Sequence, residues 1–279
     1  MPKINVSEIA AVIGQHIYQS PKQAMLKVWR REDPVSYIDS LQRNGIRVYD
    51  AYCLPKPILY YLRTIDDPYI LKCSGDSVVN DVIDRLLMSQ QKIVAFSAMK
   101  PFSNHQSPKE FKQAIIESCK GFINCNRGIR SEASIIENFE SVIGKKVVRR
   151  NYPLYTDKLG DHLWIKGRVD GVVMKDENVD EKDGIPDAIV EVKKRQRNIT
   201  FTIDIHDLVQ VHTYMHLLDI DNCYFVEDFD GTCKYQIIKR DKRFFEESIK
   251  KPLLEWYQEW HSLISSSEEQ DKFLDLESL

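Results

Sequence analysis

The segment from Ala188 to Lys194 constrains the fold most, because hydrophobic and charged residues alternate along it. Its sequence reads A-I-V-E-V-K-K. Side chains point to opposite faces of a β-strand in turn, so Glu191 and Lys193 would project from one face, and Val190 and Val192 from the other. The sequence therefore predicts a strand with one apolar face and one face that carries charged groups.

A second strand is predicted from Leu163 to Val173, and an acidic loop from Lys175 to Pro186 joins it to the first. This strand carries Asp170 among small and apolar residues, where an unpaired carboxylate is costly to bury. Antiparallel pairing across the loop would bring Asp170 close to Glu191. The two carboxylates could then share a metal ion, with Lys193 beside the attacked phosphate.

These residue types suit metal-dependent hydrolysis. Mg²⁺ prefers oxygen ligands in an octahedron and keeps several waters, so two or three carboxylates and a backbone carbonyl suffice. The metal would polarise a phosphoryl oxygen, while the Lys193 ammonium could orient water and offset transition-state charge. A simpler interpretation is a buried aspartate and a Glu-Lys pair on an ordinary sheet face, because this spacing of Asp170, Glu191 and Lys193 is common by chance.

The rest of the chain alternates predicted helices and strands. Helices are expected at Ser7–Ile13, Ser20–Arg31, Lys109–Cys119, Arg130–Ile143, Asp204–Leu218 and Arg243–Leu263, a strand at Val147–Tyr155, and a hairpin at Cys223–Asp228 and Lys234–Lys239 with its turn at Asp230-Gly231. We expect an α/β (α+β) fold in which a mixed central sheet is flanked by helices. Residues 1–264 would form one domain with an inserted lobe at about 33–108, and 265–279 an acidic, flexible tail.

Five segments form a longer pattern in this order along the chain: Ser7–Gly14 with Tyr18 and Ser20-Pro21, Arg127–Glu132, Gly167–Gly171, Glu191–Lys193, and Asp207–Gln210 with Tyr214. The pattern resembles the lambda-exonuclease and YqaJ-like viral recombinase group of the PD-(D/E)XK nuclease superfamily, and it is also similar to viral alkaline exonucleases. Two features depart from that group. Val169 stands where the superfamily name has Pro, and the span from Ser20 to Glu132 is longer than in compact members.

The resemblance implies a restriction-endonuclease-like core and a Mg²⁺-dependent DNA exonuclease, 5′-to-3′ on double-stranded DNA, in which Mn²⁺ could substitute. It implies catalytic roles for Asp170, Glu191, Lys193, Glu132 and Gln210. The metal would be held by Asp170, Glu191, Glu132 and the backbone carbonyl of Val192. DNA contacts are expected from Ser20, Arg130, Lys194 and Tyr214.

The same resemblance implies a role in viral or phage-type recombination or genome processing. A single-strand annealing protein would be a possible partner, and a homotrimeric ring would be one route to processivity. Two alternatives stay open: an endonuclease on the same fold, or a non-catalytic nucleic-acid-binding or scaffold protein whose acids are structural. Cleavage of closed circular DNA would distinguish the first, and the intact Asp170, Glu191 and Lys193 weigh against the second.

Two other groups of residues invite a functional interpretation. One predicted helix carries His206, His212 and His216, but no HExxH glutamate accompanies them, so we expect solvent or packing roles rather than a zinc site. The tryptophans of the last predicted helix recur at helical spacing with Leu253. They are expected in the core rather than as platforms for base stacking.

Composition excludes several classes of protein. Hydrophobic residues make up 43% and charged residues 29%, the balance of a globular protein. Apolar runs are far below the roughly 20 residues of a membrane span, and no signal-peptide pattern is present, so we expect an intracellular protein in the cytoplasm or nucleus of a host cell. The six cysteines form no CxxC pair and fit reduced thiols. The net charge of −3 is compatible with DNA binding, because basic strips at 145–150 and 193–197 could supply contacts or form solvated faces.

Overall fold

The computed structural model describes residues 1–44, 131–148, 154–175, 184–195, 198–199 and 202–274. The chain divides into two compact units, Met1–Val28 with Gly128–Glu259, and Trp29–Arg127 with Trp260–Leu279. All described strands belong to the first unit. Within the described ranges, no helix is both long and apolar enough to cross a membrane.

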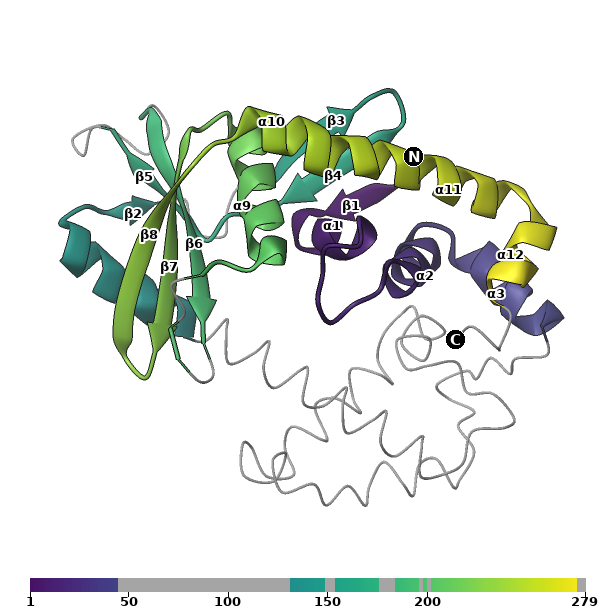
Figure 1. Cartoon of the computed structure of the whole chain (residues 1–279), viewed down its shortest axis with the longest axis horizontal. Helices are drawn as coiled ribbons and strands as arrows, with labels where there is room; N and C mark the ends of the chain where they lie inside the picture. The colour runs from purple at the N-terminus through teal and green to yellow at the C-terminus, as the bar shows by residue number, and fades with distance from the viewer. Residues whose placement is uncertain (45–130, 149–153, 176–183, 196–197, 200–201, 275–279) are drawn as a thin grey trace, which may run out of the picture. The chain divides into compact units, whose positions relative to one another are not determined.

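Two mixed β-sheets form the framework of the first unit (Figure 1). The larger sheet has the order β2 (Val147–Val148), β5 (Gly171–Met174), β6 (Pro186–Lys194), β7 (Asn222–Phe229) and β8 (Thr232–Lys239). In it, β6 and β7 are parallel and the other neighbours are antiparallel. The smaller sheet places β4 (Leu163–Gly167) between β1 (Lys3–Asn5), which is parallel to it, and β3 (Tyr155–Leu159), which is antiparallel. This architecture confirms the predicted α/β class with mixed sheets and flanking helices.

Helices cover both faces of the larger sheet. On one face, the helix at residues 131–143 packs Ile136 and Phe139 against Val190 and Val226. On the other, α9 (Ile205–Leu218) contacts β6 and β7, and it also contacts β3 of the smaller sheet (Figure 1). The alternation expected in β6 is confirmed, since Val190 faces the first helix while Glu191 hydrogen-bonds a residue of α9.

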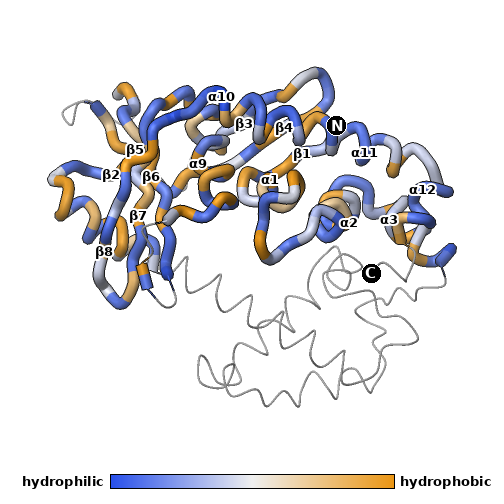
Figure 2. The backbone as a smooth tube through the Cα atoms, viewed as in Figure 1, coloured by the Kyte–Doolittle hydropathy of each residue, from blue (hydrophilic) through white to orange (hydrophobic). Residues whose placement is uncertain are grey.

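The predicted N-terminal helices are confirmed as α1 (Val6–Val12) and α2 (Pro21–Glu32). Asn5 and Glu8 form a capping box that starts α1, and Glu8 also pairs with Lys27 of α2 at 3.0 Å. Figure 2 shows the hydrophobic residues gathered in α1, which packs against α9. A buried α1 therefore supports the helix that faces Glu191.

The predicted strand from Leu163 to Val173 is wrong as a single element, because β4 and β5 belong to different sheets. Gly167 ends β4 at a point of close approach. A Cβ atom there would lie 2.6 Å from the Tyr214 ring and 2.8 Å from a methyl group of Val6. The chain leaves the smaller sheet at this glycine and enters the larger one at Gly171, so Asp170 lies in the connection.

The hairpin and the last predicted helix follow the sequence prediction. Asp230 and Gly231 have φ values of 51° and 80°, the pair of positive angles that a tight type I′ turn requires. After β8 come α10 (Lys242–Phe244), a π-helical turn (Phe245–Lys250) and α11 (Lys251–Ser265). Trp256 and Trp260 are 4% and 5% exposed, which confirms their packing role.

The second unit includes a helix within the predicted tail at 265–279, and the flexibility of that tail stays a prediction. Residues Ser267–Phe273 form α12, and Ser266 caps it by accepting a hydrogen bond from the Glu269 amide. Helix α12 contacts α3 (Pro34–Arg43), where Arg43 pairs with Asp271 at 2.9 Å. Apart from α3, the predicted lobe at 33–108 lies outside the described residues, as do the predicted helix at 109–119 and residues 275–279.

Candidate active site

Asp170 stands beside the strand that carries the Glu-x-Lys sequence. The predicted antiparallel pairing is confirmed: β5 runs along β6 with Gly171 opposite Val190. The Val192 amide donates a hydrogen bond of 2.7 Å to Asp170 Oδ2. This bond fixes one carboxylate oxygen against β6 and leaves the other, Oδ1, for a different partner.

Glu191 lies in the centre of β6 and is only 3% exposed. Its Oε1 atom accepts a hydrogen bond of 2.8 Å from Gln210 Nε2 and lies 2.9 Å from Lys193 Nζ. Its Oε2 atom is buried and has no hydrogen-bond partner among the described residues. A buried carboxylate oxygen without a hydrogen-bond partner is suited to binding a cation.

The Lys193 ammonium is enclosed by three oxygen atoms. Besides Glu191, it contacts Gln210 Oε1 at 2.9 Å and Asp207 Oδ1 at 3.2 Å. Burial alone would lower the pKa of Lys193, but Glu191 and Asp207 outweigh it, so the pKa is raised. Lys193 is therefore a fixed positive charge at neutral pH.

Carboxylates crowd this site. Burial, followed by the charges of Glu191 and Glu132, raises the pKa of Asp170 well above its usual range. Burial also raises the pKa of Glu191, partly offset by Lys193. Glu132, at the described start of the helix at 131–143, thus belongs to the same electrostatic group as the two strand carboxylates.

The described network as a whole has five carboxylates against two cations: Asp170, Glu191, Glu132, Asp207 and Glu227 against Lys193 and Arg195. Oxygen ligands of this kind suit a hard divalent cation such as Mg²⁺. The carboxylates of Asp170, Glu191 and Glu132, and above all the unpaired Oε2 of Glu191, fit such an ion. The metal role predicted for the Val192 carbonyl stays a prediction.

Gln210 and Tyr214 lie on one face of α9, as predicted. Gln210 bridges Lys193 and Glu191, donating to the carboxylate and accepting from the ammonium. Tyr214 is 5% exposed and packs against Gly167. Its ring is therefore part of the packing at the end of β4, while its contact with DNA stays a prediction.

Two of the other predicted DNA contacts, Ser20 and Lys194, pair with residues outside this network. Ser20 and Gln23 form a reciprocal cap at the start of α2, with Ser20 Oγ accepting from the Gln23 amide at 3.2 Å. Lys194 points to the opposite face of β6 from Lys193 and pairs with Asp228. Arg130 lies outside the described residues. Phosphate contacts by Ser20 and Lys194 stay predictions.

Sequence reasoning missed Asp207 and Arg195 as parts of the site. Asp207 is 2% exposed and contacts both Lys193 and Arg195, which also pairs with Glu227 at 2.6 Å. The signal was present, because a residue three positions before Gln210 shares its helix face. Arg195 likewise continues the two-residue period of Glu191 and Lys193 along one strand face.

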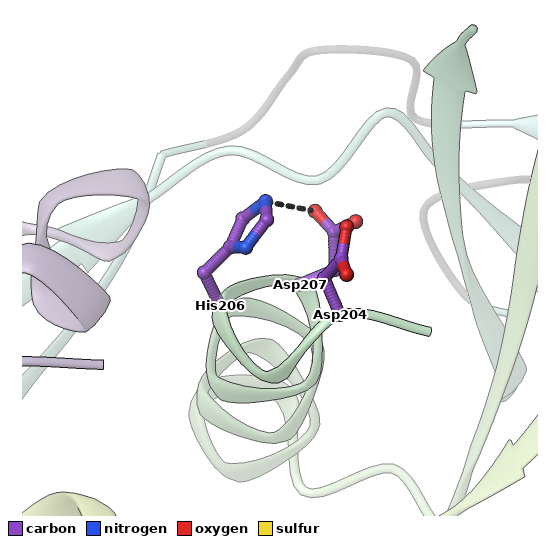
Figure 3. Close-up of side chains that lie close together, drawn as sticks. All are labelled: Asp204, His206 and Asp207. Carbon is purple, nitrogen blue, oxygen red and sulfur yellow. Dashed lines mark ion pairs between the residues drawn. The ribbon is translucent and has the colours of Figure 1, made fainter. Parts of the chain in front are cut away.

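Three side chains at the start of α9 lie close enough to hold a metal ion (Figure 3). Potential ligand atoms of Asp204, His206 and Asp207 all fall within 4.8 Å of one another, and His206 Nε2 lies 3.7 Å from Asp207 Oδ1. Asp207 already contacts two cations, Lys193 and Arg195, which weakens its attraction for a third.

The other two histidines of α9 have packing roles, as expected. His212 accepts a hydrogen bond from the Asp241 amide at 3.3 Å. His216 stacks on Phe245 with ring centroids 3.8 Å apart and lies 2.9 Å from Asp157. These contacts account for both rings within the framework of the first unit.

Comparison with known proteins found no matching protein-family model and no curated protein with a significant match. The crystal structure of LHK-Exo, an alkaline exonuclease from Laribacter hongkongensis, is similar over 54% of this chain and 75% of its own, with 16% identity and a TM-score of 0.41. LHK-Exo in complex with dAMP is similar over 57% and 85%, with 16% identity and a TM-score of 0.39. The protein SSO0001 is similar over 81% and 84%, with 12% identity and a TM-score of 0.33.

Proposed function

We propose that this chain is a metal-dependent nuclease that hydrolyses phosphodiester bonds in DNA. The observation that carries the proposal is the meeting of Asp170 and Glu191 beside a protonated Lys193, with Glu191 Oε2 buried and without a partner among the described atoms. An ordinary structural ion pair would satisfy both carboxylate oxygens, because leaving one buried and unpaired is costly.

The residues that would hold the metal are Asp170, Glu191 and Glu132, with the Val192 carbonyl as a further oxygen. Mutual repulsion among these carboxylates supports the assignment, since a divalent cation would relieve it. A bound Mg²⁺ supplies Lewis-acid stabilisation of a phosphoryl oxygen and acidifies water.

Lys193 would act on the phosphate and the attacking water. Its ammonium carries a fixed charge, and it donates a hydrogen bond of 2.9 Å to Gln210 Oε1 before substrate arrives. A preorganised cation of this kind stabilises negative charge that grows on the phosphoryl oxygens in the transition state. Gln210 contributes by orienting both Lys193 and Glu191.

The finer parts of the proposal come from the resemblance of the sequence to the lambda-exonuclease group. They are exonuclease action in the 5′-to-3′ direction on double-stranded DNA, dependence on Mg²⁺ with Mn²⁺ as a substitute, and a role in viral or phage-type recombination. A trimeric ring and a single-strand annealing partner belong to the same set of proposals.

A nuclease assay with defined DNA ends tests the proposal. Linear duplexes with a free 5′ end, a blocked 5′ end or a blocked 3′ end are incubated with the protein in Mg²⁺ and in EDTA. We expect cleavage in Mg²⁺ alone, blocked by 5′ modification, and absent from Asp170→Asn. Cleavage of closed circular DNA would show an endonuclease instead, and failure of wild type to cleave any of these DNAs would remove the proposal.

A further inference from the structure

Asp207 joins the proposed catalytic lysine to a second, firmly anchored cation. Its Oδ1 lies 3.2 Å from Lys193 Nζ, and its Oδ2 lies 3.3 Å from an Nη atom of Arg195. Arg195 is fixed independently, because its Nε pairs with Glu227 at 2.6 Å and its amide donates to the Asp228 carbonyl at 2.8 Å. Arg195 thus orients Asp207. Among the described residues, Arg195 makes no hydrogen bond to Glu191.

We propose that Asp207 is a positioning residue that holds the Lys193 ammonium at the reacting phosphate. The inference rests on the proposed nuclease function and extends it to a residue outside the carboxylate and lysine core. Asp207 itself would not touch the phosphate.

Asp207 differs from the other two oxygen partners of Lys193. Glu191 Oε1 also accepts from Gln210, and Glu191 is a proposed metal ligand, so a cation would compete with Lys193 for its charge. Gln210 is neutral. Asp207 is therefore the one full negative charge, among the described contacts of Lys193, that a bound metal would leave to the ammonium.

The anchor is also rigid. Asp207 lies in the first turn of α9, its amide donates to Asp204 O at 3.0 Å, and its side chain is buried. Lys193, in contrast, ends a flexible stem whose rotamer freedom must be restrained for it to act at one point. Fixing the Lys193 ammonium before the reaction lowers the activation barrier, because the entropy lost in ordering its side chain is lost when the protein folds and not during the reaction.

The chain supplies a matched control in the next residue. Lys194 pairs with Asp228, which is 1% exposed, on the opposite face of the same strand. Asp207→Asn and Asp228→Asn therefore each neutralise a buried aspartate that pairs with a lysine of β6. Only the first of them touches the proposed catalytic lysine, and Asp207→Glu restores the carboxylate.

Four measurements are made on each full-length variant: thermal unfolding, the increase in Tm on adding Mg²⁺, kcat and KM on linear duplex DNA, and trace acetylation of the metal-free protein with acetic anhydride. Mass spectrometry then compares labelling of Lys193 with that of Lys194. We expect Asp207→Asn to lower kcat by about tenfold or more while KM stays within about threefold. The Mg²⁺-induced rise in Tm should persist, and Asp207→Glu should recover part of kcat.

The labelling result should separate the two aspartates. Release of its anchor should expose Lys193 to the reagent in Asp207→Asn, raising its labelling relative to Lys194 by about threefold or more, whereas Asp228→Asn should raise labelling of Lys194. For kcat, Asp228→Asn should stay within about threefold of wild type, the range expected of a distant structural change.

Three outcomes would overturn the inference. Loss of the Mg²⁺-induced rise in Tm in Asp207→Asn would make Asp207 a metal ligand. Equal losses of kcat in Asp207→Asn and Asp228→Asn, in proportion to lowered Tm, would make its role structural. Unchanged Lys193 labelling in Asp207→Asn would show that Asp207 does not hold the ammonium. If wild type cleaves no DNA, the proposed function fails and the catalytic part of the inference with it, but labelling still decides whether Asp207 holds Lys193.

Discussion

Replacing Lys193 with methionine should destabilise the metal-free protein strongly. The substitution keeps most of the aliphatic stem and removes the ammonium that lies 2.9 Å from Glu191 Oε1 and 3.2 Å from Asp207 Oδ1. Both acids are nearly fully buried, at 3% and 2% exposure. Their charges would then lack the cation that they share.

The structure sets the size of this effect. Removing one partner of a buried ion pair costs about 3–5 kcal/mol, since the other charge stays buried and uncompensated. Arg195 still neutralises part of the Asp207 charge, so we expect the lower end, about 3 kcal/mol. For a chain of this size, each kcal/mol lowers Tm by about 2–4 °C, which predicts a fall of about 6–12 °C.

A second substitution identifies the cause. Glu191→Gln removes the uncompensated charge and keeps the acceptor that bonds Gln210, so Lys193→Met with Glu191→Gln should be more stable than Lys193→Met alone. Lys194→Met serves as the stability control, because it breaks the ion pair with Asp228 on the other face of β6. Glu191→Gln should not rescue Lys194→Met.

Thermal and urea unfolding in EDTA provide the measurement, because metal-free conditions isolate the contribution of the ammonium. A Tm of Lys193→Met within about 2 °C of wild type would refute the reasoning, since that is less than the shift expected for about 1 kcal/mol. Equal rescue of Lys193→Met and Lys194→Met by Glu191→Gln would refute it as well, because the effect would then be independent of the pair.

Three further predictions concern separate parts of the chain. Asp170→Asn should raise the stability of the metal-free protein, because burial, Glu191 and Glu132 all disfavour the charge of Asp170. It should also abolish the Mg²⁺-induced rise in Tm, which in wild type corresponds to about 2.7 kcal/mol when the Mg²⁺ concentration is 100 times Kd. A rise in Tm that persists in Asp170→Asn would remove Asp170 from the metal site. Arg43 lowers the pKa of Asp271, so this ion pair stabilises α12 at pH values above the ordinary carboxyl pKa, and the stabilisation is lost as pH falls through the lowered pKa of Asp271. Amide hydrogens of α12 should therefore be more protected from exchange at about pH 6 than at about pH 3, after correction for intrinsic exchange rates. Equal protection at the two pH values would contradict this prediction. Ser20→Ala should lower the free energy of unfolding by about 1 kcal/mol through loss of the helix cap. If Ser20 also binds phosphate, the substitution should weaken DNA binding at fixed salt and abolish any preference for 5′-phosphorylated ends. Unchanged DNA binding would leave the cap as the only role of Ser20.

Local periodicity explains why part of the site could be predicted. The division of β6 into a valine face and a charged face depends only on the two-residue repeat of a strand, and β5 and β6 are consecutive strands in the sequence, which favours antiparallel pairing. Gln210 reaches Glu191 because α9 lies on the charged face. Each of these relations involves neighbours in sequence or a single packing contact.

The break between β4 and β5 could not be predicted in the same way. Gly167 ends β4 where Tyr214 and Val6 pack against it, and both residues are distant in sequence. The residues from Leu163 to Val173 have the pattern of a single strand. This local pattern carries no information about Tyr214 and Val6, whose packing ends β4 at Gly167. Helix α12 is a different case. Ser266 with Glu269 three residues later is typical of the start of a helix, but the acidic composition of residues 265–279 favours disorder, and the prediction followed composition.

The basic strip at 193–197 shows why counting charges along a sequence cannot locate a DNA-binding surface. Lys193 and Arg195 point to one face of β6 and pair with Glu191, Asp207 and Glu227, while Lys194 points to the other face and pairs with Asp228. Buried acids thus neutralise every cation of the strip that the structure describes. A DNA phosphate at Lys194 would have to compete with Asp228 for the ammonium, so a run of cations in the sequence is weak evidence for a contact with the DNA backbone.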